Sequence, residues 1–324
     1  MSDHGAGLAA VLDALAADRP AAAARAAGWL DGAFADIRAS RCPEYAWRAG
    51  VLTGDGYPAE FTFTSADDDI RCTVEPWPDV AADGRLTRAL ALASAPDAKL
   101  NGQPNTELDD ELRALQPRGA RLMFGAWVGA RFGADPARDR CKVYVEIAPG
   151  AEPTGGPGFG DLACEARIEA VEPASGRRER YYRGRDVKPH HLARLLDGAG
   201  LGDRLGELRE CVEHAYGRPI DGALPGGAAG WSIARAPGQA PVLTVFLFAR
   251  ALWGGDARIV KRADEFCAWS GRALIGYAAA VAGLPPSAGA CTWHGMVGFT
   301  VAPGQPVHLA LGLRPATVRS RVAR

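Results

Sequence analysis

The sequence predicts an α/β fold in which ten antiparallel strands close a barrel inside an outer ring of helices, as one domain over residues 1–324. Segments of alternating polar and apolar residues come in neighbouring pairs, which is the pattern of β-hairpins. Five such pairs alternate with segments of helical spacing, and this indicates an internal repeat. Successive antiparallel hairpins can pair edge to edge until the sheet closes, with helices covering the outside.

The composition is that of a soluble globular protein, with 48% hydrophobic and 23% charged residues. Because 37 Lys and Arg balance 38 Asp and Glu, we expect no general binding of nucleic acid. Seven cysteines without Cys-x-x-Cys spacing favour reduced thiols and a cytoplasmic location. The N-terminus lacks the basic region of a secretory signal, and no apolar stretch reaches the ~18 residues of a membrane span.

The elements are expected in a regular order along the chain. Two Ala-rich helices lie within 6–37, divided at Arg19-Pro20, because proline is well placed at a helix start. Further helical spacing occurs at 84–95, 106–116, 187–217 and 256–281. The strand pairs are expected at 59–65 with 69–75, 121–132 with 141–147, 164–171 with 178–183, 231–234 with 242–249, and 296–301 with 307–313. The Gly- and Pro-rich segments 148–160 and 221–230 are interpreted as loops between repeats.

Several strands carry polar residues on one face, where an ordinary barrel would be apolar. Glu60 lies within the first strand and Arg71 on its partner. Lys142 and Tyr144 share a face of a later strand, since residues i and i+2 point the same way, and Arg167 lies on the next strand. If these faces line a chamber, it holds one carboxylate among cations and suits a phosphate ester beside a neutral or cationic organic molecule. The alternative is that these residues lie on solvated outer faces.

Four segments carry a resemblance to a known family: GDGYPAEFTFTSADDDIRCTVEPWPD, CKVYVEIAP, GQAPVLTVFLFARALWGGDARIVKRADEFCAWSG and HGMVGFTVAPGQPVHLALGLRP. In their order and spacing, over about residues 50–315, they resemble the aromatic prenyltransferases of the dimethylallyltryptophan synthase (DMATS) type, which have the ABBA barrel of repeated α-α-β-β units. The resemblance implies an enzyme of secondary metabolism. It would transfer a prenyl group from an allylic diphosphate to an indole-containing or other aromatic small molecule by electrophilic aromatic substitution, without metal or other cofactor.

The resemblance also implies roles for individual residues. Glu60 corresponds to the catalytic carboxylate that accepts the indole N–H. Arg71, Lys142 and Arg167 correspond to ligands of the diphosphate, whose departure needs positive charge, and Lys142 is counted as catalytic for this reason. Tyr144 corresponds to one residue of the aromatic shield that keeps water from the allylic cation.

The sequence departs from the family pattern at several positions. Thr244 and Phe246 occupy the place of Lys-x-Tyr on the fourth strand pair, and Arg167, Glu169 and Val171 that of Arg-x-Lys-x-Tyr on the third. On the closing hairpin, His308 and Gly312 replace tyrosines, and residues 127–130 contain no base lysine. Phe246, His308 and Gly312 are therefore expected to line a thinned prenyl site. Such a site predicts use of C10 or C15 donors at least as well as the C5 donor. The alternatives are a bulkier acceptor, inward collapse of neighbouring side chains, a divergent enzyme or loss of activity.

Other functions and sites remain open or are judged weaker. A prenyltransferase of peptide side chains and a non-catalytic barrel for a hydrophobic ligand are the rival functions. Asp67-Asp68-Asp69 resembles a magnesium-binding run but is better explained as a solvated turn, and His190-His191 as a helix cap. The glycines at 155–160 lack the strand-to-helix context of a dinucleotide site. No metal site is predicted, and the sequence does not indicate the oligomeric state.

Overall fold

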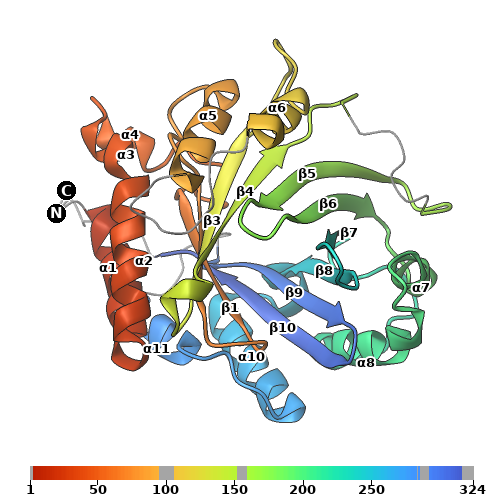
Figure 1. Ribbon diagram of the computed structural model, residues 1–324. Coiled ribbons are helices and arrows are strands. Elements are labelled where there is room, and N and C mark those ends of the chain that lie inside the picture. Colours follow the sequence, from red (N-terminus) through yellow and green to blue (C-terminus); the bar gives the residue numbers. More distant parts are fainter. Residues whose placement is uncertain (1–2, 95–105, 152–158, 283, 285–291, 316–324) are drawn as a thin grey trace, which may run out of the picture.

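The computed structural model describes residues 3–94, 106–151, 159–282, 284 and 292–315. The ten strands in these residues pair in the order β1-β10-β9-β8-β7-β6-β5-β4-β3-β2 and close into one antiparallel barrel (Figure 1). The predicted fold class is therefore confirmed, whereas the prediction that residues 1–324 form a single domain stays a prediction. None of the described helices is long and apolar enough to cross a membrane.

The strands lie at the five predicted pairs. Their bounds are β1 Ala59–Thr64, β2 Ile70–Val74, β3 Ala126–Phe132, β4 Arg140–Glu146, β5 Cys164–Glu172, β6 Arg177–Arg185, β7 Ala228–Arg235, β8 Val242–Phe248, β9 His294–Ala302 and β10 Gln305–Leu313. The strand predicted from residue 121 begins only at Ala126. The reason is a turn at Gly125, which has a φ of 70°. The carboxylate of Glu146 holds this turn by accepting the backbone N–H groups of Phe124 at 2.7 Å and Gly125 at 2.8 Å.

The helices also follow the predicted order, but two of the expected segments are broken. The helices are α1 Asp3–Asp18, α2 Pro20–Ala33, α3 Ala35–Ala39, α4 Pro43–Ala46, α5 Ala82–Ala93, α6 Thr106–Ala114, α7 Pro189–Gly198, α8 Leu205–Tyr216, α9 Ala249–Trp253, α10 Asp256–Ser270 and α11 Tyr277–Ala282. The segment 187–217 is divided by a short 3₁₀ turn at Gly202–Arg204. The segment 256–281 is divided at Gly271, whose φ of 66° ends α10.

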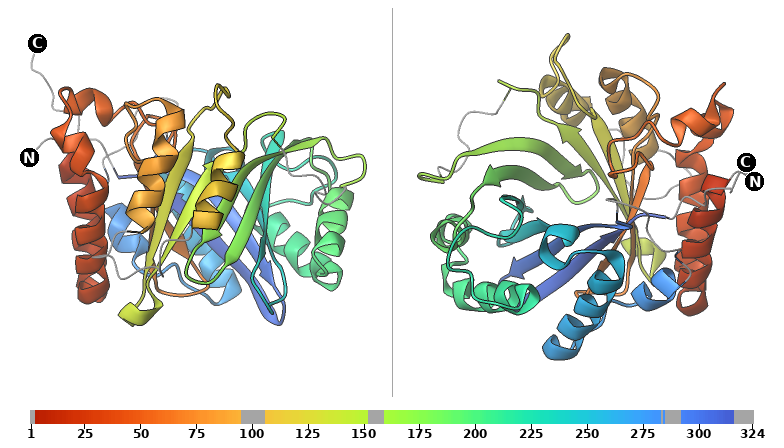
Figure 2. Two further views of the ribbon diagram at one scale, coloured as in Figure 1. Left: turned by 45° about the horizontal axis from the view of Figure 1, so that its top comes forward. Right: turned by 180° about the vertical axis from the view of Figure 1, so that it is seen from behind.

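The helices cover the outside of the barrel, as the views in Figure 2 show. Helix α2 packs on β2 and β3, α5 on β3 and β4, α8 on β9 and β10, and α9 on β8 and β9. Alternate residues of each strand face this helical layer. Phe63 of β1, for example, packs edge-on against Tyr277 of α11, with 5.5 Å between the ring centroids. The core therefore lies between barrel and helices, and the other face of each strand points inward.

The two ends of the barrel are built differently. The five short connections within strand pairs, such as 65–69 and 303–304, lie at one end, which we call the hairpin end. The longer connections between pairs leave from the opposite end, and most of them contain helices. We call this the helical end. In an antiparallel barrel, the position of a residue along its strand therefore tells which end it is near.

A buried ion pair fixes the helical end beside β2. Glu75, which is 0% exposed, accepts the backbone N–H groups of Val51 at 2.7 Å and Leu52 at 2.9 Å. Arg85 of α5 forms an ion pair with Glu75 and donates to the carbonyl of Pro78 at 2.7 Å. One carboxylate thus joins the chain before β1, the end of β2 and the start of α5.

Removing the cation of this pair is expected to destabilise the fold strongly. Arg85→Met leaves the Glu75 carboxylate buried without its counter-charge, and we expect a loss of about 3–5 kcal/mol in the free energy of unfolding. Arg88→Met is the matched control on α5, because its partner Asp36 is partly exposed at 30% and such surface pairs contribute about 1 kcal/mol or less. Urea unfolding of both variants measures the difference, and equal losses would contradict this account.

Candidate active site

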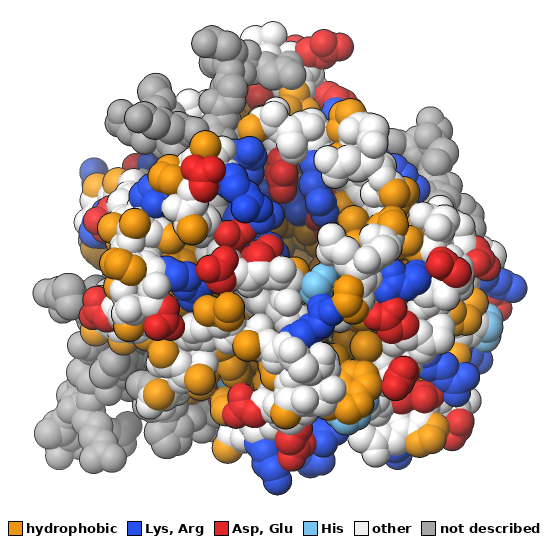
Figure 3. All heavy atoms as spheres, turned by 60° about the horizontal axis from the view of Figure 1, so that its bottom comes forward, with side chains coloured by type: hydrophobic (Ala, Val, Ile, Leu, Met, Phe, Trp, Pro, Cys, Tyr) orange, Lys and Arg blue, Asp and Glu red, His pale blue; other side chains and the backbone are white. Residues whose placement is uncertain are grey.

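The barrel encloses a chamber of about 830 Å³ that is lined by residues from all ten strands. This volume is in the range of sites that enclose small organic ligands. Figure 3 shows the face that is hollowed, with Lys and Arg, Asp and Glu, and a His side chain gathered around the hollow. All the site residues predicted from the sequence line the chamber: Glu60, Arg71, Lys142, Tyr144, Arg167, Phe246, His308 and Gly312. Each of these residues therefore lies on the strand face that was expected, while its role stays a prediction.

Cations gather at the hairpin end of the chamber. Arg71 of β2, Arg131 of β3 and Arg140 of β4 occupy directly paired positions on neighbouring strands. Arg71 lies 2.5 Å from Asp67, and Arg131 forms an ion pair with Asp69. The acidic run of the first hairpin therefore pairs with arginines in this structure, and its Asp69 N–H also donates to Asp67 Oδ1 at 3.2 Å within the turn. This agrees with the prediction of a turn at this position.

Glu60 projects into the chamber nearer the helical end, where apolar side chains such as Phe124, Phe248 and Met296 also line it. Its carboxylate forms no hydrogen bond or ion pair with any residue that the structure describes. Burial raises the pKa of its carboxyl to about 7, and the charge of Arg314 only partly opposes that shift. An unpaired carboxylate here is suited to accept a hydrogen bond from a ligand.

Lys142 is already paired inside the chamber. Its ammonium forms an ion pair with Glu179 of β6, and Glu179 Oε1 accepts the hydroxyl of Ser232 at 2.5 Å. Although burial opposes it, the Lys142 charge lowers the pKa of Glu179 to about 2. Lys142 Nζ also lies 5.2 Å from the ring centroid of Tyr144 and 5.8 Å from that of Tyr181. Any anion that binds Lys142 competes with Glu179.

Three residues of β6 that sequence reasoning missed line the chamber in one row. Arg177, Glu179 and Tyr181 have i, i+2, i+4 spacing and therefore share a face of the strand. The side-chain Nε of Arg177 is buried and has no hydrogen-bond partner among the described residues. The same alternation that was used for Lys142 and Tyr144 could have identified this row in RRERYYRGR.

Two of the three residues that the resemblance places at the motif of the third strand pair do not face the chamber. Glu169 of β5 pairs with Arg180 at 2.7 Å, and Val171 is buried at 1% exposure in the hydrophobic core, so neither faces the chamber as expected. The pattern Arg-x-acid-x-Tyr that does face it is the β6 row of Arg177, Glu179 and Tyr181.

Arg167 lines the chamber at a different place from Arg71 and Lys142. The β5–β6 register shifts between Ala166 and Ile168, which places a bulge at Arg167. Ile168 is paired with Glu146, four residues beyond Lys142 on β4. At about 3.3 Å per residue this is roughly 13 Å along the strand. Arg167 lies 3.9 Å from Glu146, so the structure does not bring it into one cluster with Arg71 and Lys142.

An aromatic strip runs around part of the chamber wall. Tyr144 of β4 and Tyr181 of β6 have ring centroids 5.9 Å apart, and Tyr181 stacks on Phe246 of β8 at 5.8 Å. The intervening strands carry small residues opposite the rings, Ala170 beside Tyr144 and Gly230 beside Phe246. The rings reach one another across β5 and β7 because no large side chain stands between them.

The remaining predicted positions have specific neighbours. His308 Nδ1 lies 2.7 Å from Arg272, and burial together with that guanidinium lowers the pKa of His308. A Cβ placed on Gly312 would lie only 2.6 Å from Oε1 of Glu60. The space that a tyrosine would have begun to fill is therefore occupied by the Glu60 carboxylate. The sequence argument that Gly312 leaves room for a longer prenyl tail is not supported.

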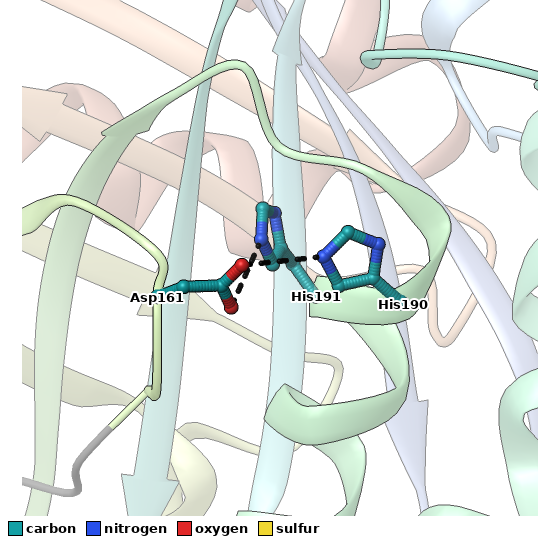
Figure 4. Close-up of side chains that lie close together, drawn as sticks. All are labelled: Asp161, His190 and His191. Carbon is teal, nitrogen blue, oxygen red and sulfur yellow. Dashed lines mark ion pairs between the residues drawn. The ribbon is translucent and has the colours of Figure 1, made fainter.

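Outside the barrel, Asp161, His190 and His191 lie close together (Figure 4). His191 Nδ1 accepts the backbone N–H of Lys188 at 3.0 Å, so in the neutral ring Nε2 carries the proton and faces Asp161 at 3.5 Å. Asp161 also pairs with Arg194. A proton on Nε2 leaves no lone pair there for a metal, and we therefore interpret the cluster as a cap of α7, as the sequence predicts.

Glu60 is expected to make the stability of the fold decrease with rising pH. Its carboxyl titrates near its ordinary value of 4.5 in the unfolded chain and near 7 in the folded chain, so the folded chain binds more protons between these values. At ~1.4 kcal/mol per pKa unit, the parent should lose on the order of 2–3 kcal/mol relative to Glu60→Gln across this window. Urea unfolding of both proteins at several pH values measures this loss, and a constant difference would contradict it.

No protein-family model matches the sequence, and a search of curated proteins finds no match. Among solved structures, 5-dimethylallyl tryptophan synthase from Streptomyces coelicolor has a TM-score of 0.79 at 17% identity, over 100% of this chain and 98% of that one. The 6-dimethylallyltryptophan synthase from Micromonospora olivasterospora has a TM-score of 0.77 at 16% identity, over 98% of each chain. The prenyltransferase PriB has a TM-score of 0.74 at 16% identity, over 97% and 96%. The chain therefore has the fold of these prenyltransferases, the ABBA barrel.

Proposed function

We propose that this protein transfers a prenyl group from an allylic diphosphate to an indole-containing or other aromatic small molecule by electrophilic aromatic substitution. The observation that carries the proposal is the order of side chains within one chamber. Cations lie toward the hairpin end, and the aromatic strip of Tyr144, Tyr181 and Phe246 follows along the same strands. Glu60, which has no partner among the described residues, faces the chamber from β1.

The cationic end suits the leaving group. Arg71, Lys142 and Arg177 would meet the diphosphate oxygens, where negative charge increases as the allylic C–O bond breaks. The Nε atoms of Arg71 and Arg177 are buried and lack a hydrogen-bond partner among the described residues, so a phosphate oxygen could satisfy them. Because these side chains supply the positive charge, we propose that the reaction needs no metal ion. Glu179 limits that charge by holding Lys142.

The aromatic strip and Glu60 suit the other two partners of the reaction. The faces of Tyr144, Tyr181 and Phe246 can stabilise an allylic cation while keeping water away from it. Glu60 can accept the N–H of an indole and make the ring more electron-rich. The allylic C–O bond breaks, a carbon–carbon bond forms to the ring, and the ring carbon loses its proton to the released diphosphate. Two of the structural neighbours are complexes with DMASPP and Trp, which makes the C5 donor and tryptophan the first pair to assay.

Glu60→Gln is expected to abolish most of the transfer. The amide keeps the shape of the side chain but loses the negative charge that orients the acceptor N–H, and we expect kcat/KM to fall by on the order of 10²–10⁴. Steady-state kinetics with C5, C10 and C15 allylic diphosphates measures this effect and the preferred donor length together. Glu165→Gln, at an exposed position on β5, is the control. A Glu60→Gln variant as active as the parent would remove Glu60 from the mechanism.

The cation set is tested by binding of inorganic pyrophosphate in calorimetry. Arg71→Ala and Arg177→Ala should each weaken the affinity about tenfold or more, since a charge-assisted hydrogen bond contributes roughly 1.5–3 kcal/mol. Arg167→Ala is the matched control and should change it little, because Arg167 lies beside Glu146. Glu179→Gln should strengthen binding by releasing Lys142. Equal effects of Arg167→Ala and Arg177→Ala would contradict this assignment.

Assays separate this proposal from its rivals. A barrel that only binds a hydrophobic ligand would release no diphosphate from any donor in the presence of acceptors. A screen of free indoles against tryptophan-containing peptides distinguishes a small-molecule enzyme from one that modifies peptide side chains. A cytoplasmic location and a role in secondary metabolism are part of the proposal and follow from the sequence analysis alone.

A further inference from the structure

Strand β9 has a bulge where it faces Glu60. The register between β9 and β10 shifts so that two residues, Gly295 and Met296, oppose the single residue Gly312. Such a bulge places an extra residue on one side of a strand and locally bends it. Here both glycines, on the neighbouring strands β10 and β9, lie against the carboxylate that projects from β1.

The Glu60 carboxylate fills the space that side chains on these glycines would need. A Cβ on Gly312 would lie 2.6 Å from Oε1 and 2.7 Å from Cδ of Glu60, and a Cβ on Gly295 would overlap Oε2. Any side chain at either position therefore requires Glu60 to move. The Glu60 carboxylate has no hydrogen-bond partner among the described residues. Its orientation is therefore restricted by the backbone at Gly295 and Gly312.

The bulged segment is itself held in place from the helical layer. His294, the residue before Gly295, is buried at 3% exposure. Its Nδ1 lies 2.5 Å from Asp256 Oδ1, and its Nε2 lies 2.8 Å from the hydroxyl of Tyr277. In the neutral ring, Nδ1–H donates to the carboxylate and Nε2 accepts the tyrosine proton. Asp256 also accepts the backbone N–H of Trp293 at 2.9 Å, so the start of β9 is fixed on both sides of the chain.

We propose that Gly295 and Gly312 are positioning residues that form a niche for the Glu60 carboxylate and thereby set the direction in which it meets the acceptor N–H. The inference rests on the proposed function for the identity of the acceptor, but the niche is defined by the chain alone. A methyl group at either glycine would displace the carboxylate toward the chamber. A misplacement of about 1 Å of a group that orients a substrate can cost on the order of 10² in rate.

The kinetic test uses Gly295→Ala and Gly312→Ala. Each should lower kcat/KM for the acceptor by about 10- to 100-fold and leave the affinity for pyrophosphate within about twofold of the parent. In a Glu60→Gln background the same changes should cause no further loss, because they act through the carboxylate. Losses that multiply with that of Glu60→Gln would assign the glycines a general structural role and overturn the proposal.

Gly230→Ala, on β7, is the matched control within the chamber wall. The atoms nearest to a Cβ there lie at 3.4–3.9 Å, in ordinary contact, and none of them belongs to Glu60. This variant adds the same methyl group to the chamber wall without touching the niche. Any loss of kcat/KM that Gly230→Ala causes should multiply with the loss caused by Glu60→Gln, as is usual for independent sites.

A second readout needs no turnover. In protein with ¹³C-labelled glutamate, the carboxyl signal of Glu60 is the one that disappears in Glu60→Gln. It should shift in Gly295→Ala and Gly312→Ala and stay in place in Gly230→Ala. If the Ala variants show these shifts but the parent transfers no prenyl group, the proposed function is refuted and the niche is supported. Unshifted signals together with parental kcat/KM would refute the niche alone.

A second substitution tests whether a loss of stability comes from contact between the new methyl group and Glu60. If Gly312→Ala lowers the melting temperature, the double variant Gly312→Ala, Glu60→Asp should recover it, since the shorter side chain withdraws its carboxylate from the new methyl group. The exposed Glu165→Asp in the same background serves as the control and should recover nothing. No recovery with Glu60→Asp would show that the methyl group does not meet the carboxylate, which overturns the proposal.

Discussion

Charge that is enclosed in a protein must be balanced nearby, and this constraint organises the interior of the barrel. Every strand turns alternate side chains toward the chamber, where burial makes an isolated ion costly. Lys142 therefore has Glu179, and Arg71 has Asp67. Glu60 has no such partner among the described residues, and its raised pKa reflects this. The balance explains why cations and acids are interleaved within a chamber that would bind an anion.

The fold could be predicted because its main signal is local. Alternation within 59–65 and 69–75, and in four later pairs, marks hairpins, and their number and regular spacing indicate closure. The predicted strand boundaries were less accurate where a single long-range contact overrides the alternation of polar and apolar residues. The turn at Gly125, held by the Glu146 carboxylate, removes the first residues of the expected strand at 121–132. That contact joins residues 21 apart, which no local pattern in the sequence contains.

The site was predicted in part, and the errors have physical reasons. Alternation placed Glu60, Arg71, Lys142 and Tyr144 on chamber-facing positions. On β5 it held for Arg167 but not for Glu169 and Val171, because the bulge at Arg167 changes which residues face inward. The β6 row escaped notice because its middle residue, Glu179, is an acid where a lysine was sought on this strand pair. The contact between Gly312 and Glu60 joins two ends of the chain, and only closure of the barrel brings them together.

The two ends of the barrel differ in how much their connections can change in length. Turns at the hairpin end run from two residues at 303–304 to seven at 133–139, so the cations at the strand ends are tied closely to the strand pairs. At the helical end, connections such as 75–125 and 249–293 run for tens of residues, and Phe248 and Met296 line the chamber near that end. Insertions there can reshape this end of the chamber while the cations at the hairpin end stay in place. A lineage of such barrels could acquire new aromatic partners repeatedly without reinventing how it activates the donor.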